Sequence, residues 1–320
     1  MMKRLKQAVA WMQKPSSGDS VGEEPDQPVV IAEPEDLAQK VAAYWTGHNV
    51  TSHHEFTSSE RSEQYFDWRN DQYFNYINLM PVTGHDGKVI LDYGCGPGHD
   101  LVGFGLRSRP HKLIGMDVSS SSIAEAEKRL RLHSIDVELT RLAADAKTLP
   151  LANHSVDYIH CSGVLHHVLD PEQTLAEFRR ILKPTGRLGI MVYNYDSLWL
   201  HLYVAYLTVI VNGRFGDLDI RSAFSKMTDG EECPIARVYR MSEFTEFASA
   251  GGFDTVSSGA AISMYEMTMF PRRFEAMMDP RLRVESRKFL QELTLDARGY
   301  PVYRGNYAGV DGCYLLSPSS

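Results

Sequence analysis

The chain lacks the features that define several large classes of protein. Its 320 residues include four cysteines, at positions 95, 161, 233 and 313, and none of them forms a Cys-x-x-Cys pair. This scarcity argues against a disulfide framework and against a cysteine-rich zinc site, and it favours the reducing cytoplasm. No apolar run reaches the length that crosses a bilayer, so the sequence predicts no stable membrane insertion.

An excess of positive charge is also missing. Lys and Arg together number 33 and Asp and Glu 41, which gives a formal net charge of −8 at pH 7. Such a chain has little general attraction for the phosphates of nucleic acids or for anionic lipids. We therefore expect a small-molecule substrate and no nucleic-acid partner, whereas the oligomeric state stays open.

Composition divides the chain into a short N-terminal segment and one larger domain. Residues 1–14 place apolar positions at helical spacing among basic ones, and residues 15–36 are rich in Pro, Ser, Gly, Glu and Asp. Too few apolar side chains are present there to offset the entropy of ordering the backbone. We predict a flexible segment over residues 1–39 and a single domain over residues 40–320.

Residues 85–195 alternate short apolar runs with amphipathic stretches, which is typical of a parallel sheet covered by helices. The expected strands are 89–92, 113–117, 137–142, 156–161 and 188–193, followed by one after residue 253 and one over 308–316. The expected helices include 122–132, which follows a serine-rich cap, 171–183, which begins at a proline, and 242–250. The pattern predicts a doubly wound α/β core.

The most informative motif lies at the end of the first of these strands. The strand runs into the sequence Gly94-Cys95-Gly96-Pro97-Gly98. Glycines let a ligand approach the backbone, and the helix expected from residue 99 would aim its amide hydrogens at that ligand. The spacing is Gly-x-Gly-x-Gly, which differs from the Gly-x-Gly-x-x-Gly of dinucleotide-binding proteins.

An acidic residue follows at the end of the second strand. Asp117 stands 19 residues after Gly98, and its carboxylate can accept hydrogen bonds from both hydroxyls of a ribose. A helix-capping role is the structural alternative. Together with the glycine turn, the acid favours a nucleoside-containing ligand.

Several spaced signatures resemble the class I S-adenosylmethionine-dependent methyltransferases, in particular the subgroup of ubiquinone, menaquinone and small-molecule O-methyltransferases. They lie at residues 91–98, 115–119, 144–157, 163–168 and 181–186. One departure is Thr185, where the family usually has a glycine. The resemblance implies a Rossmann-like sheet of seven strands, the last of them antiparallel, and S-adenosylmethionine as the cofactor.

The resemblance also implies how the methionine end of the cofactor is held. Asp92 would orient its ammonium group. Cys161 or Ser162 would offer a backbone carbonyl to the same group. The turn beneath the methionine moiety would be formed by Gly94, Cys95, Gly96 and Gly98.

The nucleoside end of the cofactor would lie over the next two strands of the sheet. By the same resemblance, Asp117 would hold the ribose hydroxyls. Met116 and Val118 would pack around the adenine. Asp145 and the amide of Ala146 would contact its exocyclic nitrogen edge.

Two histidines are the candidate catalytic residues. Methyl transfer from a sulfonium needs donor and acceptor in line, and a hydroxyl acceptor must also lose a proton. His166 and His167 follow the fourth strand, at the edge where such folds bind ligands, and an imidazole can act as a base near neutral pH. Packing beneath the cofactor is the structural alternative for either ring.

Aromatic residues crowd the segments on both sides of these motifs. Tyr65, Trp68 and Tyr76 share one face of an expected helix. We predict a mainly helical cap made of residues 44–80 with insertions at 195–240 and 264–297. The substrate-binding candidates are Tyr65, Trp68, Tyr193 and Asn194.

The leading hypothesis is an O-methyltransferase that acts on a sugar hydroxyl or a phenol. Methylation at carbon or nitrogen, as in quinone biosynthesis, is the alternative within the fold, and a non-catalytic cofactor-binding subunit is the alternative outside enzymes. The glycine spacing disfavours an NAD dehydrogenase. No metal site is predicted, because the adjacent His53, His54 and Glu55 point in divergent directions.

Overall fold

One large mixed sheet carries most of the core in the computed structural model, which describes residues 34–49 and 54–319. Its strand order is β1-β7-β11-β6-β5-β2-β3-β4. In chain order the strands are β1 Tyr73–Phe74, β2 Val89–Tyr93, β3 Lys112–Asp117, β4 Glu138–Arg141, β5 Val156–Ser162, β6 Leu182–Tyr193, β7 Phe253–Ser263 and β11 Asp311–Pro318.

The strand directions confirm the predicted doubly wound sheet with an antiparallel last strand. Strands β2 to β6 pair in parallel, and β11 pairs antiparallel with both β6 and β7. The carboxyl ends of β2, β3, β5 and β6 therefore reach the same edge of the sheet, where α/β folds bind their ligands.

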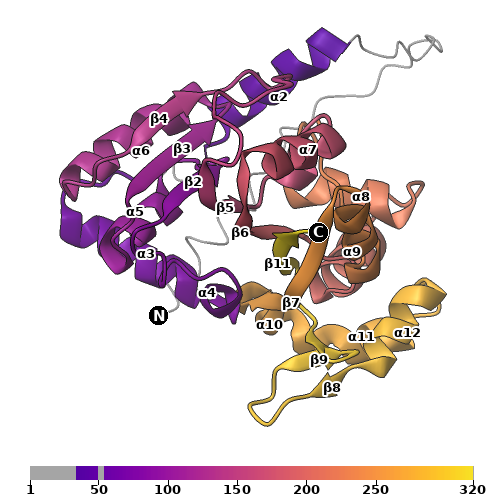
Figure 1. The fold of residues 1–320 in the computed structure, drawn as a ribbon. Helices are drawn as coiled ribbons and strands as arrows, with labels where there is room; N and C mark the ends of the chain where they lie inside the picture. Colours follow the sequence, from indigo (N-terminus) through magenta and orange to yellow (C-terminus); the bar gives the residue numbers. More distant parts are fainter. Residues whose placement is uncertain (1–33, 50–53, 320) are drawn as a thin grey trace. The chain divides into compact units, whose positions relative to one another are not determined.

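Helices cover both faces of this sheet (Figure 1). The helices on one face are α3 Ser59–Asp71, α5 His99–Arg107 and α6 Ser120–Leu132, and those on the other are α7 Pro171–Ile181 and α9 Met241–Ala250. On the first face Phe104 and Leu130 belong to the same buried cluster as Ile90. On the second, Phe178 and Phe244 belong to the same buried cluster as Ile159. The two clusters enclose the sheet on both sides.

The element bounds differ from the sequence prediction at several ends. Helix α7 ends at Ile181, before the predicted residue 183, and β6 begins directly at Leu182. Pro184 has no backbone N–H and disfavours a helical residue before it, which explains the early end of the helix. The last strand begins at Asp311, later than the predicted residue 308.

Helix α2 Pro34–Gly47 begins inside the segment that was predicted to be flexible. Residues 34–39 are helical, and the compact unit that contains the sheet starts at Pro34. Residues 1–33, which make up the rest of the predicted flexible segment, lie outside the described residues, as does His53 of the rejected metal cluster.

The predicted continuous aromatic helix is wrong beyond Asp71. Helix α3 ends there, β1 pairs Tyr73 with Ser263, and the short helix α4 Tyr76–Leu79 follows. Pairing with β7 uses backbone groups that a helix would bond internally, and the amide of Met264 also donates to the carbonyl of Gln72 at 2.8 Å. Tyr76 therefore does not share a helical face with Tyr65.

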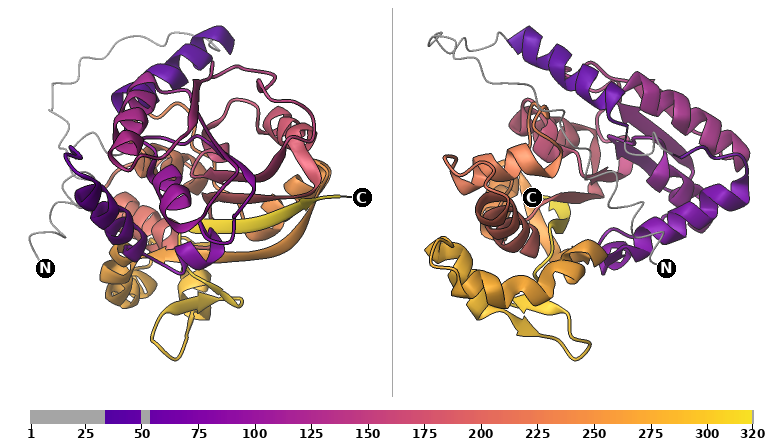
Figure 2. Two further views of the ribbon diagram at one scale, coloured as in Figure 1. Left: turned by 60° about the vertical axis from the view of Figure 1, so that its left-hand side comes forward. Right: turned by 180° about the vertical axis from the view of Figure 1, so that it is seen from behind.

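The two insertions are mainly helical, and a small three-stranded sheet lies at the end of the second one. Residues 195–240 form the π-helix η2 Trp199–Val211 and α8 Ile220–Thr228. The later insertion contains α10 Met264–Met269, η3 Phe270–Arg272, α11 Arg273–Met278 and α12 Val284–Glu292. A small sheet, not predicted, follows as β8 Thr294–Leu295, β9 Pro301–Tyr303 and β10 Asn306–Tyr307. It lies beside α11 and α12 in both views of Figure 2. Within residues 34–49 and 54–319 no helix is long and apolar enough to cross a membrane.

A buried carboxylate joins both insertions to the sheet. Glu266 is fully buried, and its Oε2 accepts hydrogen bonds from the amide and the hydroxyl of Ser263, both at 2.9 Å. Its Oε1 accepts from the amide of Trp199 at 3.1 Å, at the first turn of η2. Both carboxylate oxygens face donors, so the site requires two acceptors.

We expect Glu266→Gln to destabilise the fold. The glutamine amide puts an N–H group where a second acceptor is needed, and an unsatisfied buried donor costs about 1–3 kcal/mol. Urea unfolding should show a loss in this range. The matched control Glu275→Gln changes an exposed carboxylate on α11 and should stay within about 0.5 kcal/mol of the parent. Equal stability of the two variants would contradict this role of Glu266.

Candidate functional site

The glycine turn that follows β2 is bonded to the end of β3. The amides of Gly94 and Cys95 both donate to the carbonyl of Met116, at 2.7 and 3.0 Å. Gly94, Gly96 and Gly98 have φ values of 75°, 52° and 77°, which side chains with a Cβ rarely adopt. Gly98 is the N-cap of α5. The predicted turn thus lies at the carboxyl edge of the sheet, with a helix N-terminus next to it.

Asp117 lies at this turn, as predicted. Its Oδ2 accepts a hydrogen bond from the amide of Gly96 at 2.8 Å, and its Oδ1 accepts from the amide of Ser119 at 2.7 Å. Burial raises the pKa of Asp117, and these backbone donors oppose the shift. The N-cap of α6 is Ser119, whose side chain accepts from the amide of Ser122, so Asp117 itself is not the helix cap. A carboxylate has about four lone-pair sites, so two remain for a ligand.

Asp92 is a buried carboxylate with unused bonding capacity. It is 2% exposed, and its Oδ2 has no hydrogen-bond partner among the described residues. Burial raises the pKa of Asp92 to about 7, with Asp100 and Asp117 acting in the same direction and His160 against it. A buried acceptor without a donor fits a ligand that carries an ammonium group.

Arg69 on α3 is a functional candidate that the sequence analysis missed. Its guanidinium lies 5.1 Å from the ring centroid of Tyr76, and its Nη1 is buried with no hydrogen-bond partner in the described part of the chain. Burial raises the pKa of Asp92 and of Asp311, and the positive charge of Arg69 opposes both shifts. In the sequence, Arg69 is marked only by its place among aromatic residues. That pattern does not indicate a ligand-binding residue.

Most of the residues predicted around the adenine are more exposed to solvent than Asp92. Val118 is half-buried, whereas Asp145 and Ala146 are exposed in the loop after β4. The amide of Ala146 donates to the carbonyl of Ala143 at 3.1 Å. These positions form a loop next to the end of β3, and their contacts with the adenine stay predictions.

The end of β5 is tightly packed. Cys161 is fully buried. Ser162 and Tyr76 share a hydrogen bond of 2.5 Å between their hydroxyls, which joins α4 to the carboxyl edge of the sheet. The carbonyl role predicted for Cys161 or Ser162 stays a prediction.

His166 and His167 form the 3₁₀ turn η1 Leu165–His167 and differ in their contacts. His166 is fully buried, its ring centroid lies 3.9 Å from that of Tyr193, and neither ring nitrogen has a hydrogen-bond partner among the described residues. Burial holds the pKa of His166 well below its usual value. This ring therefore stays neutral.

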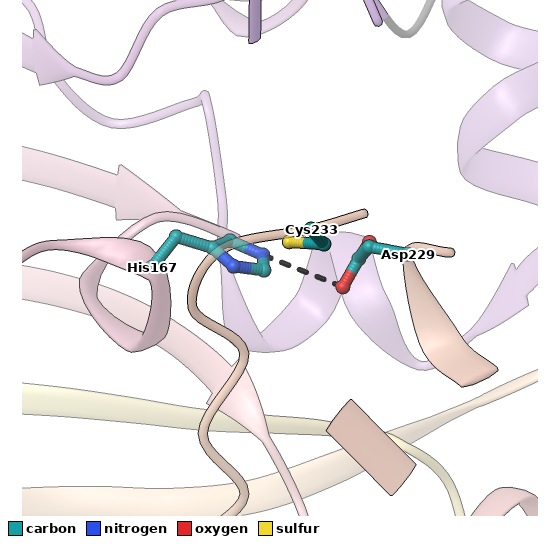
Figure 3. A group of neighbouring side chains, drawn as sticks. All are labelled: His167, Asp229 and Cys233. Carbon is teal, nitrogen blue, oxygen red and sulfur yellow. Dashed lines mark ion pairs between the residues drawn. The ribbon is translucent and has the colours of Figure 1, made fainter. Parts of the chain in front are cut away.

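His167 has a defined orientation. Its Nδ1 lies 2.5 Å from the carbonyl oxygen of Ile235, and because a carbonyl can only accept, Nδ1 carries the proton. The lone pair of Nε2 then faces Asp229, whose Oδ2 is 3.7 Å away (Figure 3). Burial lowers the pKa of His167, and the charge of Asp229 opposes the shift.

Asp229, at the end of α8, is a second residue that sequence reasoning missed. The hydroxyl of Tyr193 lies 2.9 and 3.1 Å from its two carboxylate oxygens. The hydroxyl of Tyr44 on α2 donates to its backbone carbonyl, and the ring centroid of Trp45 lies 4.8 Å from that of His167. The first insertion and α2 thus meet over η1. No local pattern pointed to Asp229.

The remaining substrate candidates have structural contacts. Asn194 is buried, and its amide nitrogen donates to the carbonyls of Asp196 and Gly309 at 3.0 and 2.9 Å. Tyr65 packs against Trp68, with ring centroids 5.4 Å apart, and lies close to the ring of His99. Tyr193 alone among the four contacts both His166 and Asp229.

Comparison with known proteins identifies the domain. Residues 91–190 match the family described as "Methyltransferase domain". With the strand order and the glycine turn, this match indicates that these residues form a class I methyltransferase domain, a family whose cofactor is S-adenosylmethionine. The buried, unpaired acceptor of Asp92 fits the ammonium group of that cofactor.

Two curated relatives and one solved structure illustrate the similarity. An uncharacterised 37.1 kDa protein of transposon TN4556 from Streptomyces fradiae is 39% identical over 127 residues, 39% of this chain and 36% of that protein. The ubiquinone biosynthesis O-methyltransferase of Azoarcus sp. is 30% identical over 148 residues, 44% of this chain and 58% of that enzyme. The chain therefore spans less than two thirds of either relative.

The fold likeness extends over more of the chain than the sequence likeness. A complex of a Haloferax volcanii methyltransferase activator with a methyltransferase contains a chain that aligns with a TM-score of 0.50 and 16% identity. The alignment covers 90% of this chain and all of the other. It supports the fold alone.

We expect cofactor affinity to depend on the ionisation of Asp92. The ammonium group of the cofactor pairs with the carboxylate form, so affinity should fall as the pH drops below about 7 and Asp92 becomes protonated, by at most about tenfold per pH unit. Isothermal titration calorimetry with S-adenosylhomocysteine should show this slope. In Asp92→Asn binding should be weaker and independent of pH over the same range, and an unchanged slope in that variant would exclude Asp92 as its source.

We also expect Gly94→Ala to abolish cofactor binding. An added Cβ would lie 2.2 Å from Cγ2 of Val164, and the residue has a φ of 75°. Gly84→Ala is the matched control, because its φ is 79° and no atom lies within 4 Å of the added carbon. The control should lose about 1–2 kcal/mol of stability and keep its affinity. Normal affinity in Gly94→Ala would show that the turn does not form the cofactor site.

Proposed function

We propose that this protein transfers the methyl group of S-adenosylmethionine to a hydroxyl group of a small molecule, with His167 as the base. The orientation of His167 carries the proposal: Nδ1 is bonded to a carbonyl, and the Nε2 lone pair points toward Asp229 at the carboxyl edge of the sheet. The Azoarcus relative, named for O-methylation in ubiquinone biosynthesis, supports a hydroxyl acceptor.

The methionine end of the cofactor would bind between α3 and the glycine turn. Arg69 offers a cation whose Nη1 is buried and unpaired among the described residues, and Asp92 offers a buried unpaired Oδ2. These two charges match the carboxylate and the ammonium group of the methionine moiety. Asp117 would use its remaining lone pairs for the ribose hydroxyls, while the bond from Gly96 holds its carboxylate in place.

The acceptor would bind on the other side of η1, next to Tyr193 and Asp229. When bound, the cofactor supplies a methyl group on a sulfonium, from which the neutral thioether is a good leaving group. The chain has to align the acceptor oxygen and remove its proton. His167 Nε2 would take that proton, and the imidazolium formed would be stabilised by the carboxylate of Asp229, 3.7 Å away. Tyr193 is a positioning residue, because its hydroxyl holds that carboxylate.

His167→Gln should lower kcat for methyl transfer by about 10²–10⁴-fold, which is the usual contribution of a general base. Catechol and hydroquinone serve as phenolic acceptors, and release of S-adenosylhomocysteine reports turnover. Cofactor affinity should not change, because His167 lies on the acceptor side. Asp229→Asn should lower kcat less, and Asp229→Glu should recover part of the loss.

His111→Gln is the control for this series, since His111 is exposed and lies just before β3. A wild-type kcat in His167→Gln, with the control also active, would remove the histidine base. Transfer to carbon or nitrogen would then be the better assignment. Cofactor binding without transfer to any acceptor would favour a non-catalytic binding subunit.

A further inference from the structure

Three side chains with different ligand chemistry converge above η1: His167, Asp229 and Cys233 (Figure 3). One ligand atom from each lies within 4.8 Å of the other two, and His167 Nε2 is 3.7 Å from Asp229 Oδ2. The ligand atoms of a tetrahedral zinc site are about 3.3–3.6 Å apart, given bonds of about 2.0–2.3 Å. Small side-chain rotations would therefore bring all three atoms onto one ion.

His167 Nε2 and Asp229 Oδ2 face each other at 3.7 Å, and both atoms are acceptors. The carbonyl of Ile235 fixes the proton of His167 on Nδ1, so Nε2 presents a lone pair. The facing Asp229 oxygen is also an acceptor, and 3.7 Å is too long for a hydrogen bond. A cation placed between the two atoms would satisfy both lone pairs.

The groups around these ligands resemble the outer layer of known metal sites. A metal-bound histidine usually donates its other N–H to a carbonyl or carboxylate, which is the contact that His167 makes with Ile235. A metal-bound carboxylate is usually hydrogen-bonded in turn, as Asp229 is to Tyr193. The orientation of two of the three ligands is thus already fixed without an ion.

We propose that His167, Asp229 and Cys233 bind one divalent transition-metal cation of borderline softness, such as Zn²⁺. An imidazole, a carboxylate and a thiolate suit Zn²⁺ or Co²⁺, whereas Mg²⁺ and Ca²⁺ prefer oxygen ligands. With Cys233 as a thiolate and Asp229 ionised, the two negative charges balance the dication. Cys233 is buried and its thiol donates to the carbonyl of Ile235 at 3.4 Å, so binding of a cation releases the thiol proton.

The site has a consequence that rests on the proposed function. Nε2 of His167 has one lone pair, which cannot both bind a cation and accept the proton of the acceptor. The metal-bound state and the proton-accepting state therefore exclude each other. A cation at this site turns methyl transfer off without displacing the cofactor.

The test is a titration of the purified, chelator-treated full-length chain with Co²⁺, followed by visible and near-ultraviolet absorption. We expect one Co²⁺ per chain, the d–d bands of tetrahedral Co²⁺ and a thiolate-to-cobalt charge-transfer band, all displaced by Zn²⁺. Cys233→Ala should lose the charge-transfer band. Asp229→Asn should bind Co²⁺ at least about tenfold more weakly.

Cys313→Ala is the matched control, because Cys313 is another buried cysteine but lies on β11, and it should keep the band. Thermal unfolding and cofactor binding establish that each variant is folded. A wild-type chain without the band, or a band that survives in Cys233→Ala, overturns the site.

The consequence is tested separately, by methyl transfer to catechol with and without Zn²⁺. Each variant is compared with its own metal-free rate, and Zn²⁺ should lower the wild-type rate at least tenfold while the rate of Cys233→Ala responds far less. If Co²⁺ gives the expected spectrum but Zn²⁺ leaves the wild-type rate unchanged, the metal site stands and the base role of His167 fails. The Co²⁺ spectrum tests the site even if no acceptor is methylated.

Discussion

The hydrogen bonds between the glycine turn and the end of β3 are the interaction on which the site depends. The carbonyl of Met116 accepts from two successive amides of the turn, and the carboxylate of Asp117 accepts from a third. These bonds fix where the turn lies relative to the carboxyl edge of the sheet. Because the ends of β2 and β3 are in register, they also fix the separation of Asp92 and Asp117.

A second set of contacts comes from segments far away in the sequence. Helix α2, the end of α8 and the end of β6 all meet at Asp229, through Tyr44 and Tyr193. Glu266 joins the start of η2 to the end of β7. Under the proposed function the ends of β2 and β3 would hold the cofactor together with α3, and η1, the end of β6 and the first insertion would hold the acceptor.

The sequence predicted the parts of the structure that depend on local patterns. The parallel strands, the turn at Gly94 and the place of Asp117 follow from apolar periodicity and glycine spacing, which act over a few residues. The candidate roles of Arg69 and Asp229 could not be predicted, because they depend on contacts with residues that are distant in the sequence. The end of α3 at Asp71 was missed for a similar reason: the pairing of β1 with β7 joins residues nearly two hundred positions apart and outweighs local helix propensity.

The position of α2 bears on the kinetics of turnover. Tyr44 and Trp45 lie directly against Asp229 and His167, so a molecule that reaches η1 from that side has to displace the helix. Helix α2 is held there by the hydrogen bond of Tyr44, by a second bond of 2.7 Å from the hydroxyl of Ser121 to the carbonyl of Thr46, and by ring contacts. Under the proposed function the acceptor passes this helix, so the opening of α2 would precede both acceptor binding and product release.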